Sequence, residues 1–177
     1  MNRKLKLEEL GRPELEEFKS SKKNPVVIVL DNIRSFNNVG SIFRTADAFA
    51  IEKIILCGIT PAPPHRDIHK TALGATESVT WDYEKNTIDA VKKLKEEGYT
   101  IASIEQAEHK IWLQDVKLAP NSKIALVFGH EVDGVEQEVI DISDLVIEIP
   151  QYGTKHSINI SVCAGIVMWE IVRKLGS

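Results

Sequence analysis

The chain has 177 residues, of which 43% are hydrophobic and 27% charged, and its formal net charge is −4. These values are typical of a single soluble globular domain. The acidic balance argues against a sequence-independent nucleic-acid binder, although a local basic rim on an acidic body would still allow RNA binding. No apolar run reaches transmembrane length and residues 1–6 lack a signal-peptide core, so we expect a cytoplasmic protein with no membrane partner.

Strands and helices alternate along most of the chain. Residues 1–24 are charged and predict an accessory helix over about 6–18 and a linker, followed by the main domain over 25–177. The predicted strands are 26–30, 53–57, 99–104, 123–128 and 145–149. The predicted helices are 39–50, 87–97, 135–140 and a final helix after 159, and 58–80 is expected to be a loop. This alternation predicts an α/β fold with a largely parallel sheet flanked by helices.

The final helix carries two apolar stripes. The first follows the spacing i, i+3, i+4, i+7, and a second stripe lies beside it. Two apolar faces predict burial against the core and against something else, such as a partner subunit. The stripes consist of Ile160, Cys163, Ala164, Val167, Met168 and Ile171, and of Val162, Ile166, Trp169 and Val172.

Three polar or glycine-rich segments each follow a predicted strand: 31–41, 129–134 and 151–159. In open parallel sheets, ligands bind beyond the carboxyl ends of the strands. These distant segments should therefore meet at one edge of the sheet and form one composite site.

Some polar residues of the first two segments have structural alternatives. Asn38 is expected to cap the helix that follows it, and Asp133 or Gly134 the next one. Arg44 is either a solvated helical charge or a guanidinium that reaches back to the site, where its planar donors would suit a phosphate or carboxylate. Glu131 has no evident structural task and is the candidate functional carboxylate.

In the third segment, Ser157 or Asn159 is expected to cap the final helix. Lys155 and His156 could be ordinary loop charges.

Other chemistries lack their motifs. The sequence has no glycine-rich dinucleotide or phosphate loop and no nucleophile elbow. His65 and His69 are spaced i, i+4, but no cysteine or acidic cluster completes a metal site, so we expect no metal. Cys57 and Cys163 lie in apolar segments and are expected to be buried thiols in a reducing compartment.

Taken together, the three segments resemble the motifs of the SPOUT methyltransferases, in their SpoU/TrmH-like branch, over residues 25 to 174. Order, spacing and position all agree. His130 departs from the family pattern, which more often has asparagine there. The matching residues are Asn38, Val39, Gly40, Ser41, Ile42, Phe43 and Arg44; Phe128, Gly129, Glu131 and Gly134; and Ile149, Pro150, Gly153, Ser157, Ile158, Asn159, Ser161, Ala164 and Gly165.

The resemblance implies an α/β fold with a deep C-terminal trefoil knot, S-adenosylmethionine as cofactor, and a homodimer through the last helix. It also implies methylation of a ribose 2′-hydroxyl in tRNA or rRNA. We expect tRNA, because residues 1–24 are at most an accessory helix and no long N-terminal RNA-binding domain is present. The alternative is a non-catalytic RNA-binding or assembly factor on the same scaffold.

The resemblance also assigns expected roles to individual residues. A guanidinium keeps its proton above about pH 12, so Arg44 should grip a phosphate and stabilise negative charge rather than act as a base. The expected catalytic set is Arg44, Asn38, Glu131, Ser157 and Asn159. The expected cofactor contacts are Phe128, Gly129, Glu131, Ile149, Gly153, Ser157 and Ile158. The expected RNA contacts are Arg44, His65, Arg66, Lys70, Lys155 and His156, with His69 a further rim candidate.

Overall fold

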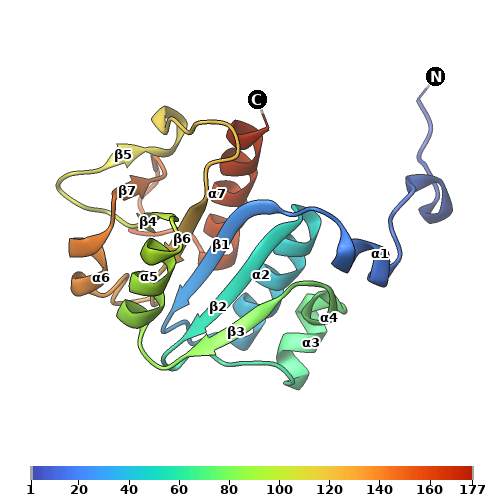
Figure 1. Ribbon diagram of the computed structural model, residues 1–177, viewed down its shortest axis with the longest axis horizontal. Coiled ribbons are helices and arrows are strands. Elements are labelled where there is room, and N and C mark those ends of the chain that lie inside the picture. The colour runs from blue at the N-terminus through green and yellow to red at the C-terminus, as the bar shows by residue number, and fades with distance from the viewer. Residues whose placement is uncertain (1, 177) are drawn as a thin grey trace.

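The computed structural model describes residues 2–176 and contains a seven-stranded sheet with helices on both faces (Figure 1). The strand order is β3-β2-β1-β6-β4-β7-β5, and all neighbouring strands pair in parallel. The predicted α/β fold with a parallel sheet is confirmed. The strands are β1 (Asn24–Asp31), β2 (Ile51–Cys57), β3 (Trp81–Glu84), β4 (Thr100–Ile104), β5 (Ile111–Trp112), β6 (Ile124–Phe128) and β7 (Leu145–Glu148).

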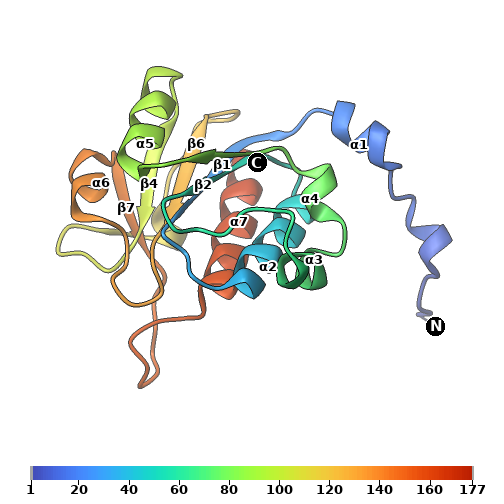
Figure 2. The same ribbon diagram turned by 90° about the horizontal axis from the view of Figure 1, so that it is seen from below.

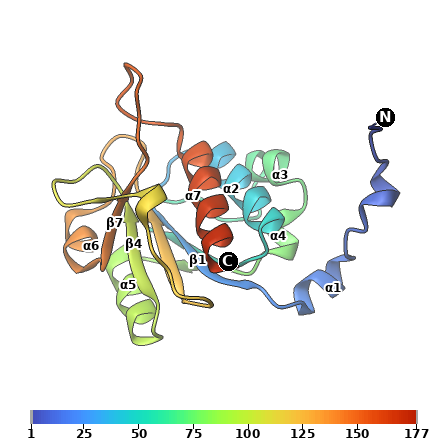
Figure 3. The same ribbon diagram turned by 90° about the horizontal axis from the view of Figure 1, so that it is seen from above.

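The helices cover the sheet in two layers (Figures 2 and 3). One face carries α2 (Phe36–Ala48) and α7 (Ile160–Leu175), with α3 (Arg66–Ala72) and α4 (Ala75–Ser78) packed against α2. The other face carries α5 (Thr87–Glu96) and α6 (Gln137–Ile142). Each layer therefore has its own apolar core.

The interior strand β1 explains why both faces are covered. Val26, Ile28 and Leu30 face the layer of α2 and α7, while Val27 and Val29 face α5 and α6. All five side chains are at most 1% exposed. Full burial of such a side chain stabilises the fold by about 1.5–3 kcal/mol, so this continuous apolar run requires a helix on each side.

The N-terminal prediction was wrong in detail. Instead of one helix over 6–18, the chain forms a 3₁₀ helix η1 (Leu7–Leu10) and a separate helix α1 (Leu15–Ser20). Gly11 ends the first in the left-handed conformation, with φ of 58°. Pro13 follows two residues later and lacks the N–H that a continuous helix needs.

Several short elements were not predicted. The expected loop over 58–80 contains α3 and α4, and β3, β5 and the 3₁₀ helix η2 (Leu113–Asp115) were also missed. The helix predicted over 135–140 begins at Gln137, with Glu136 rather than Asp133 or Gly134 at its N-cap position. The helix predicted over 39–50 begins at Phe36, because the Ser35 side chain caps it by accepting the N–H of Asn38.

The carboxyl ends of the parallel strands meet at one edge, as predicted. The segment that joins β7 to α7 extends beyond this edge before the chain returns to the α2 face (Figure 3). The first residue of α7 follows Asn159, whose side chain accepts the N–H groups of Ser161 and Val162. The capping role predicted for Ser157 or Asn159 thus belongs to Asn159. The knot implied by the family resemblance stays a prediction.

Candidate active site

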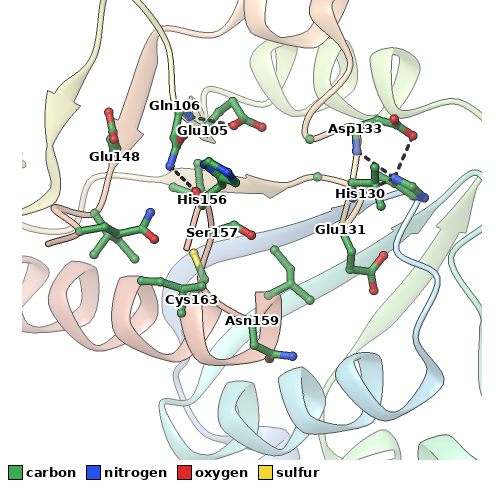
Figure 4. A pocket seen from close by; sticks show the side chains of 18 of the residues that line it. Glu105, Gln106, His130, Glu131, Asp133, Glu148, His156, Ser157, Asn159 and Cys163 are labelled. Atoms are coloured by element: carbon green, nitrogen blue, oxygen red, sulfur yellow. Dashed lines mark hydrogen bonds and ion pairs between the residues drawn. The ribbon is translucent and has the colours of Figure 1, made fainter. Parts of the chain in front are cut away.

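A cavity of about 440 Å³ lies at this edge of the sheet (Figure 4). Four chain segments line it: 104–106 after β4, 129–134 after β6, 147–151 at the end of β7, and 156–160 leading into α7, with Cys163 one turn further on. The second and third polar segments of the sequence therefore converge as predicted. Figure 4 labels Glu105, Gln106, His130, Glu131, Asp133, Glu148, His156, Ser157, Asn159 and Cys163 around this space.

The first polar segment joins the cavity through Glu131. One carboxylate oxygen of Glu131 accepts the backbone N–H of Arg34 at 3.0 Å, and the other accepts that of Ser35 at 3.2 Å and the Asn38 amide at 3.3 Å. The Asn38 amide oxygen in turn accepts the Asn159 amide at 3.2 Å. The three side chains Glu131, Asn38 and Asn159 form a hydrogen-bonded chain, called here the polar bridge, that connects all three segments.

Hydrogen bonds to its carboxylate determine the charge state of Glu131. Burial alone would raise the pKa of its carboxyl, but the N–H groups of Arg34 and Ser35 and the Asn38 amide outweigh burial and lower the pKa. Hydrogen bonds to the charged form of a carboxylate have this effect. Glu131 is therefore a carboxylate at neutral pH and binds the start of α2 to the loop after β6.

We expect Glu131→Gln to lower the free energy of unfolding at pH 7 by about 1 kcal/mol, because one amide N–H₂ would face backbone donors. The lowered pKa of Glu131 stabilises the fold above the unfolded pKa of about 4.3, and this contribution disappears as pH falls through the folded pKa. The difference between variant and wild type should thus shrink in acid. Urea unfolding at pH 7 and pH 3 measures it, with the exposed Glu96→Gln on α5 as control. An equal difference at both pH values would contradict the assignment.

The loop after β6 is tightly folded at its glycine. A Cβ on Gly129 would lie 2.1 Å from the carbonyl carbon of Gly134 and from the nitrogen of Val135, so no larger residue fits. Glu105 closes the same loop from β4 by accepting the N–H of Val135 at 3.0 Å. Glu105 was missed by the sequence analysis, although it follows a strand at the same edge of the sheet.

His130, the departure from the family pattern, turns its Nδ1 toward its own loop. This nitrogen accepts the N–H groups of Val132 at 3.2 Å and Asp133 at 3.1 Å. It also lies 2.9 Å from the Asp133 carboxylate, an ion pair only if the ring is protonated. The two arrangements exclude each other, since an accepting nitrogen has no proton to donate. The two backbone bonds define the geometry of the loop.

The structure brings together most of the predicted site residues, but not all of them. Phe128 is fully buried beneath the cavity, and Gly153 lies exposed in the outer part of the loop between β7 and α7. Neither lines the cavity. The predicted residues that do line it are Gly129, Glu131, Ile149, His156, Ser157, Ile158 and Asn159.

Arg44 does not reach the cavity, which corrects the expectation that its guanidinium turns back to this edge. It lies six residues beyond Asn38, about 9 Å along the helix and on another side of it. There it is exposed and lines a second cavity between the N-terminal segment and α4, together with Arg12 and Asp47. Among the described residues, no hydrogen bond or ion pair engages its guanidinium.

The predicted RNA contacts fall into two groups. Arg66 and Lys70 are exposed on α3, beside the first turn of α2, and His65 caps α3. Lys155 and His156 are exposed in the loop between β7 and α7, where the carbonyl of His156 accepts the Gln106 side chain at 2.8 Å. The two groups approach the cavity from different chain segments.

The cavity lining suits a small, partly cationic organic molecule. Isoleucines from β4, β7 and the start of α7 provide apolar walls. Four carboxylates line the cavity, Glu105, Glu131, Asp133 and Glu148; Glu148 is paired with Lys110 at 3.4 Å, and the other three give the rim a negative charge. An apolar cavity with a few polar groups is the usual form of a cofactor site. Within residues 2–176, no group of three or more histidine, cysteine or acidic side chains is placed to hold a metal ion.

Comparison with known proteins identifies the family. The model of the SpoU rRNA Methylase family matches residues 25–169, and the chain therefore belongs to this family. It is 33% identical over 148 residues to a putative TrmH family tRNA/rRNA methyltransferase of Staphylococcus haemolyticus, covering 84% of this chain and 58% of the relative. It is 30% identical over 167 residues to a 23S rRNA (guanosine-2′-O-)-methyltransferase of Vibrio parahaemolyticus, covering 94% and 66%.

The fold agrees with this assignment. An AdoMet-bound rRNA methyltransferase from Sinorhizobium meliloti superimposes with a TM-score of 0.81 and 25% identity, covering 90% of this chain and 61% of the other. The chain thus spans between 58% and 66% of the length of these three proteins. In the part of the chain that the structure describes, no helix has the length and apolar character to cross a membrane.

Proposed function

We propose that the chain is an S-adenosylmethionine-dependent RNA methyltransferase that acts on a ribose 2′-hydroxyl, with tRNA as the substrate and rRNA as the second candidate. The observation that carries the proposal is the cavity in a chain of the SpoU family, lined by two side chains of the polar bridge, Glu131 and Asn159. The names of the relatives support it, since they include both RNA classes and the 2′-oxygen. We also propose that the chain acts in the cytoplasm, where tRNA and rRNA would be available to it.

The cofactor site that we propose is the cavity. The bound cofactor supplies an electrophilic methyl group on a sulfonium. Gly129, Ile149, Ser157 and Ile158 line the space and would hold the cofactor through backbone groups and apolar contacts. The negative rim complements its positive charges, because opposite charges attract more strongly in a partly enclosed cavity than in water.

The polar bridge supplies orientation. Transfer to a ribose oxygen needs that oxygen in line with the methyl group, so positioning is a large part of catalysis. Glu131 and Asn38 lie where the cavity meets α2, and we assign to them the placement of the RNA strand. Asn159 keeps Asn38 in place and fixes the start of α7. Ser157 is exposed at the cavity and completes the set.

Arg44 is the proposed electrostatic residue. Its exposed guanidinium suits an RNA phosphate next to the reacting ribose, and it would stabilise the negative charge that develops on the oxygen. Because it does not line the cavity of its own chain, it is assigned to the RNA and not to the cofactor.

We also propose a homodimer through α7. The first apolar stripe of this helix is buried, with Ala164, Val167 and Met168 0% exposed. The second stripe is open: Val162 is 52%, Ile166 39% and Trp169 58% exposed. The Phe49 ring lies beside it, 6.0 Å from the Trp169 ring. A contiguous apolar surface of this kind is typical of an interface, and an identical helix offers the matching surface.

Incubation with radiolabelled S-adenosylmethionine and separate tRNA and rRNA pools tests the activity. We expect label in the tRNA, at a ribose, as mapped by mass spectrometry of the digested RNA. Label in rRNA alone selects the second candidate. RNA binding without transfer to either pool, with the cofactor bound in calorimetry, would instead identify a non-catalytic assembly factor.

A further inference from the structure

An aromatic pair lies at the start of α2, outside the cavity. The rings of Phe36 and His65 stack with centroids 3.9 Å apart and planes inclined by 31°. Nδ1 of His65 accepts the backbone N–H of Asp67 at 3.2 Å, which fixes the orientation of the imidazole. Phe36 is nevertheless 36% exposed, so part of this residue remains open to solvent.

Close contacts between α2 and α3 fix the backbone beside the pair. Thr71 on α3 donates its hydroxyl to the carbonyl of Asn37, next to Phe36, at 3.1 Å. A Cβ on Gly40 would lie 2.4 Å from the carbonyl oxygen of Ile68, which shows how closely α2 and α3 approach. A ligand that binds to this surface therefore meets a backbone and a His65 ring that are already in place, which lowers the entropic cost of binding.

The aromatic pair is connected to the cavity through Glu131. Ser35, directly before Phe36, donates its N–H to Glu131, and Glu131 lines the cavity. Asn38 of the polar bridge lies in the same first turn of α2. A strand whose ribose reaches the cavity would therefore pass a neighbouring nucleotide across the Phe36 ring.

The surroundings of the pair are basic in a chain with a net charge of −4. Arg34, Arg66 and Lys70 are exposed around it. The acidic neighbours are Asp67, which lies 3.9 Å from Arg66, and Glu131, whose carboxylate is held by the N–H groups of Arg34 and Ser35. The side chain of Arg66 is 95% exposed. An exposed aromatic face flanked by cations is the combination that binds single-stranded nucleic acid, through base stacking and phosphate contacts.

We infer that the Phe36–His65 pair is a stacking platform for an unpaired base of the RNA, with Arg34, Arg66 and Lys70 on the adjacent phosphates. The inference rests on the proposed function for the identity of the ligand. Stacking tolerates every base, so the platform contributes affinity and strand placement rather than sequence choice.

The affinity for a fluorescently labelled, mixed-sequence single-stranded RNA oligonucleotide, measured by anisotropy at fixed salt, tests the platform. Phe36→Ala should weaken binding at least about fivefold, the effect of losing one base–aromatic stack. Phe36→Leu keeps apolar packing against α3 but no stacking face, and should weaken binding similarly. Phe36→Tyr should bind within twofold of wild type.

The salt dependence separates stacking from phosphate contacts. Arg66→Ala and Lys70→Ala should each reduce the slope of log affinity against log salt by about 0.7, the value for one phosphate contact on a single strand. Phe36→Ala should leave this slope unchanged. Lys92→Ala, an exposed charge on α5 across the sheet, is the matched control and should change neither quantity.

Two results would overturn the platform. The wild type could show no measurable affinity for the oligonucleotide, or both Phe36→Ala and Phe36→Leu could bind it as tightly as the wild type does. Thermal melting checks that the variants are folded, and the leucine variant keeps the test decisive if the alanine variant is not. Transfer assays separate this inference from the proposed function. If the wild type binds RNA, the Phe36 variants lose affinity and no methyl group is transferred, only the proposed activity is refuted. If the wild type transfers methyl groups and both Phe36 variants bind RNA as tightly as the wild type, only the platform is refuted.

Discussion

Replacement of Arg44 by alanine is expected to reduce methyl transfer to RNA by about 100-fold or more, with the affinity for S-adenosylmethionine within twofold of wild type. Removing a single group that stabilises charge in a transition state typically costs 10²–10³ in rate. The cofactor affinity should persist because Arg44 lines the second cavity and not the proposed cofactor site. Single-turnover transfer and calorimetry with the cofactor measure the two quantities separately.

Two further variants make this experiment specific. Arg44→Lys retains the charge but loses the planar fork of donors, and we expect only partial recovery of the rate. Arg12→Ala removes another guanidinium from the same second cavity and should leave the rate within about threefold of wild type. If Arg44→Ala lost cofactor binding, or retained full activity, the assigned role would be wrong.

A charge in the open stripe of α7 is expected to separate the proposed dimer. Wild type should elute at about twice its chain mass of 19.8 kDa in size-exclusion chromatography with light scattering. Ile166→Glu combined with Trp169→Glu should elute at the mass of one chain, since two carboxylates would be desolvated at the core of the interface. Because both side chains are exposed within one chain, the variant should keep the far-UV circular dichroism of wild type.

The control for this variant is Lys92→Glu on α5, which adds a carboxylate to an exposed helix on the opposite face of the sheet and should leave the mass at two chains. A wild type that elutes as one chain at concentrations of tens of micromolar would refute the dimer through α7. Loss of the dimer with full transfer activity would show that one chain suffices for the reaction.

The larger elements could be predicted because their sequences carry strong periodic signals. The apolar run of β1 and the first stripe of α7 each determine burial on their own, and both predictions are confirmed. The missed elements β3 and β5 have four and two residues, too few for a period to appear. β3 and β5 are strands because they pair with β2 and β7, and these pairings form only when the chain is folded.

The sequence predicts which chain segments form the candidate site, but not which hydrogen-bond partners their side chains choose. Strand ends identify the loops at 129–134 and 151–159, because a parallel sheet brings its carboxyl ends together. Ser35 caps α2 in place of Asn38, the predicted cap, and the Asn38 side chain is bonded to Glu131 and Asn159. Which of these hydrogen bonds Asn38 forms is settled only when the three segments come together in the folded chain. The placement of Arg44 depends in the same way on where α2 begins.

The position of β1 in the sheet has a consequence for how the chain folds as it is synthesised. β1 is one of the first elements made, yet one of its two neighbours, β6, begins about a hundred residues later. α7, which covers the same strand, comes last of all. Until then, an apolar strand has an unpaired edge, the condition under which nascent chains aggregate or require chaperones. We therefore expect fragments that end before β6 to be insoluble and the folding of the complete chain to be slow for its size.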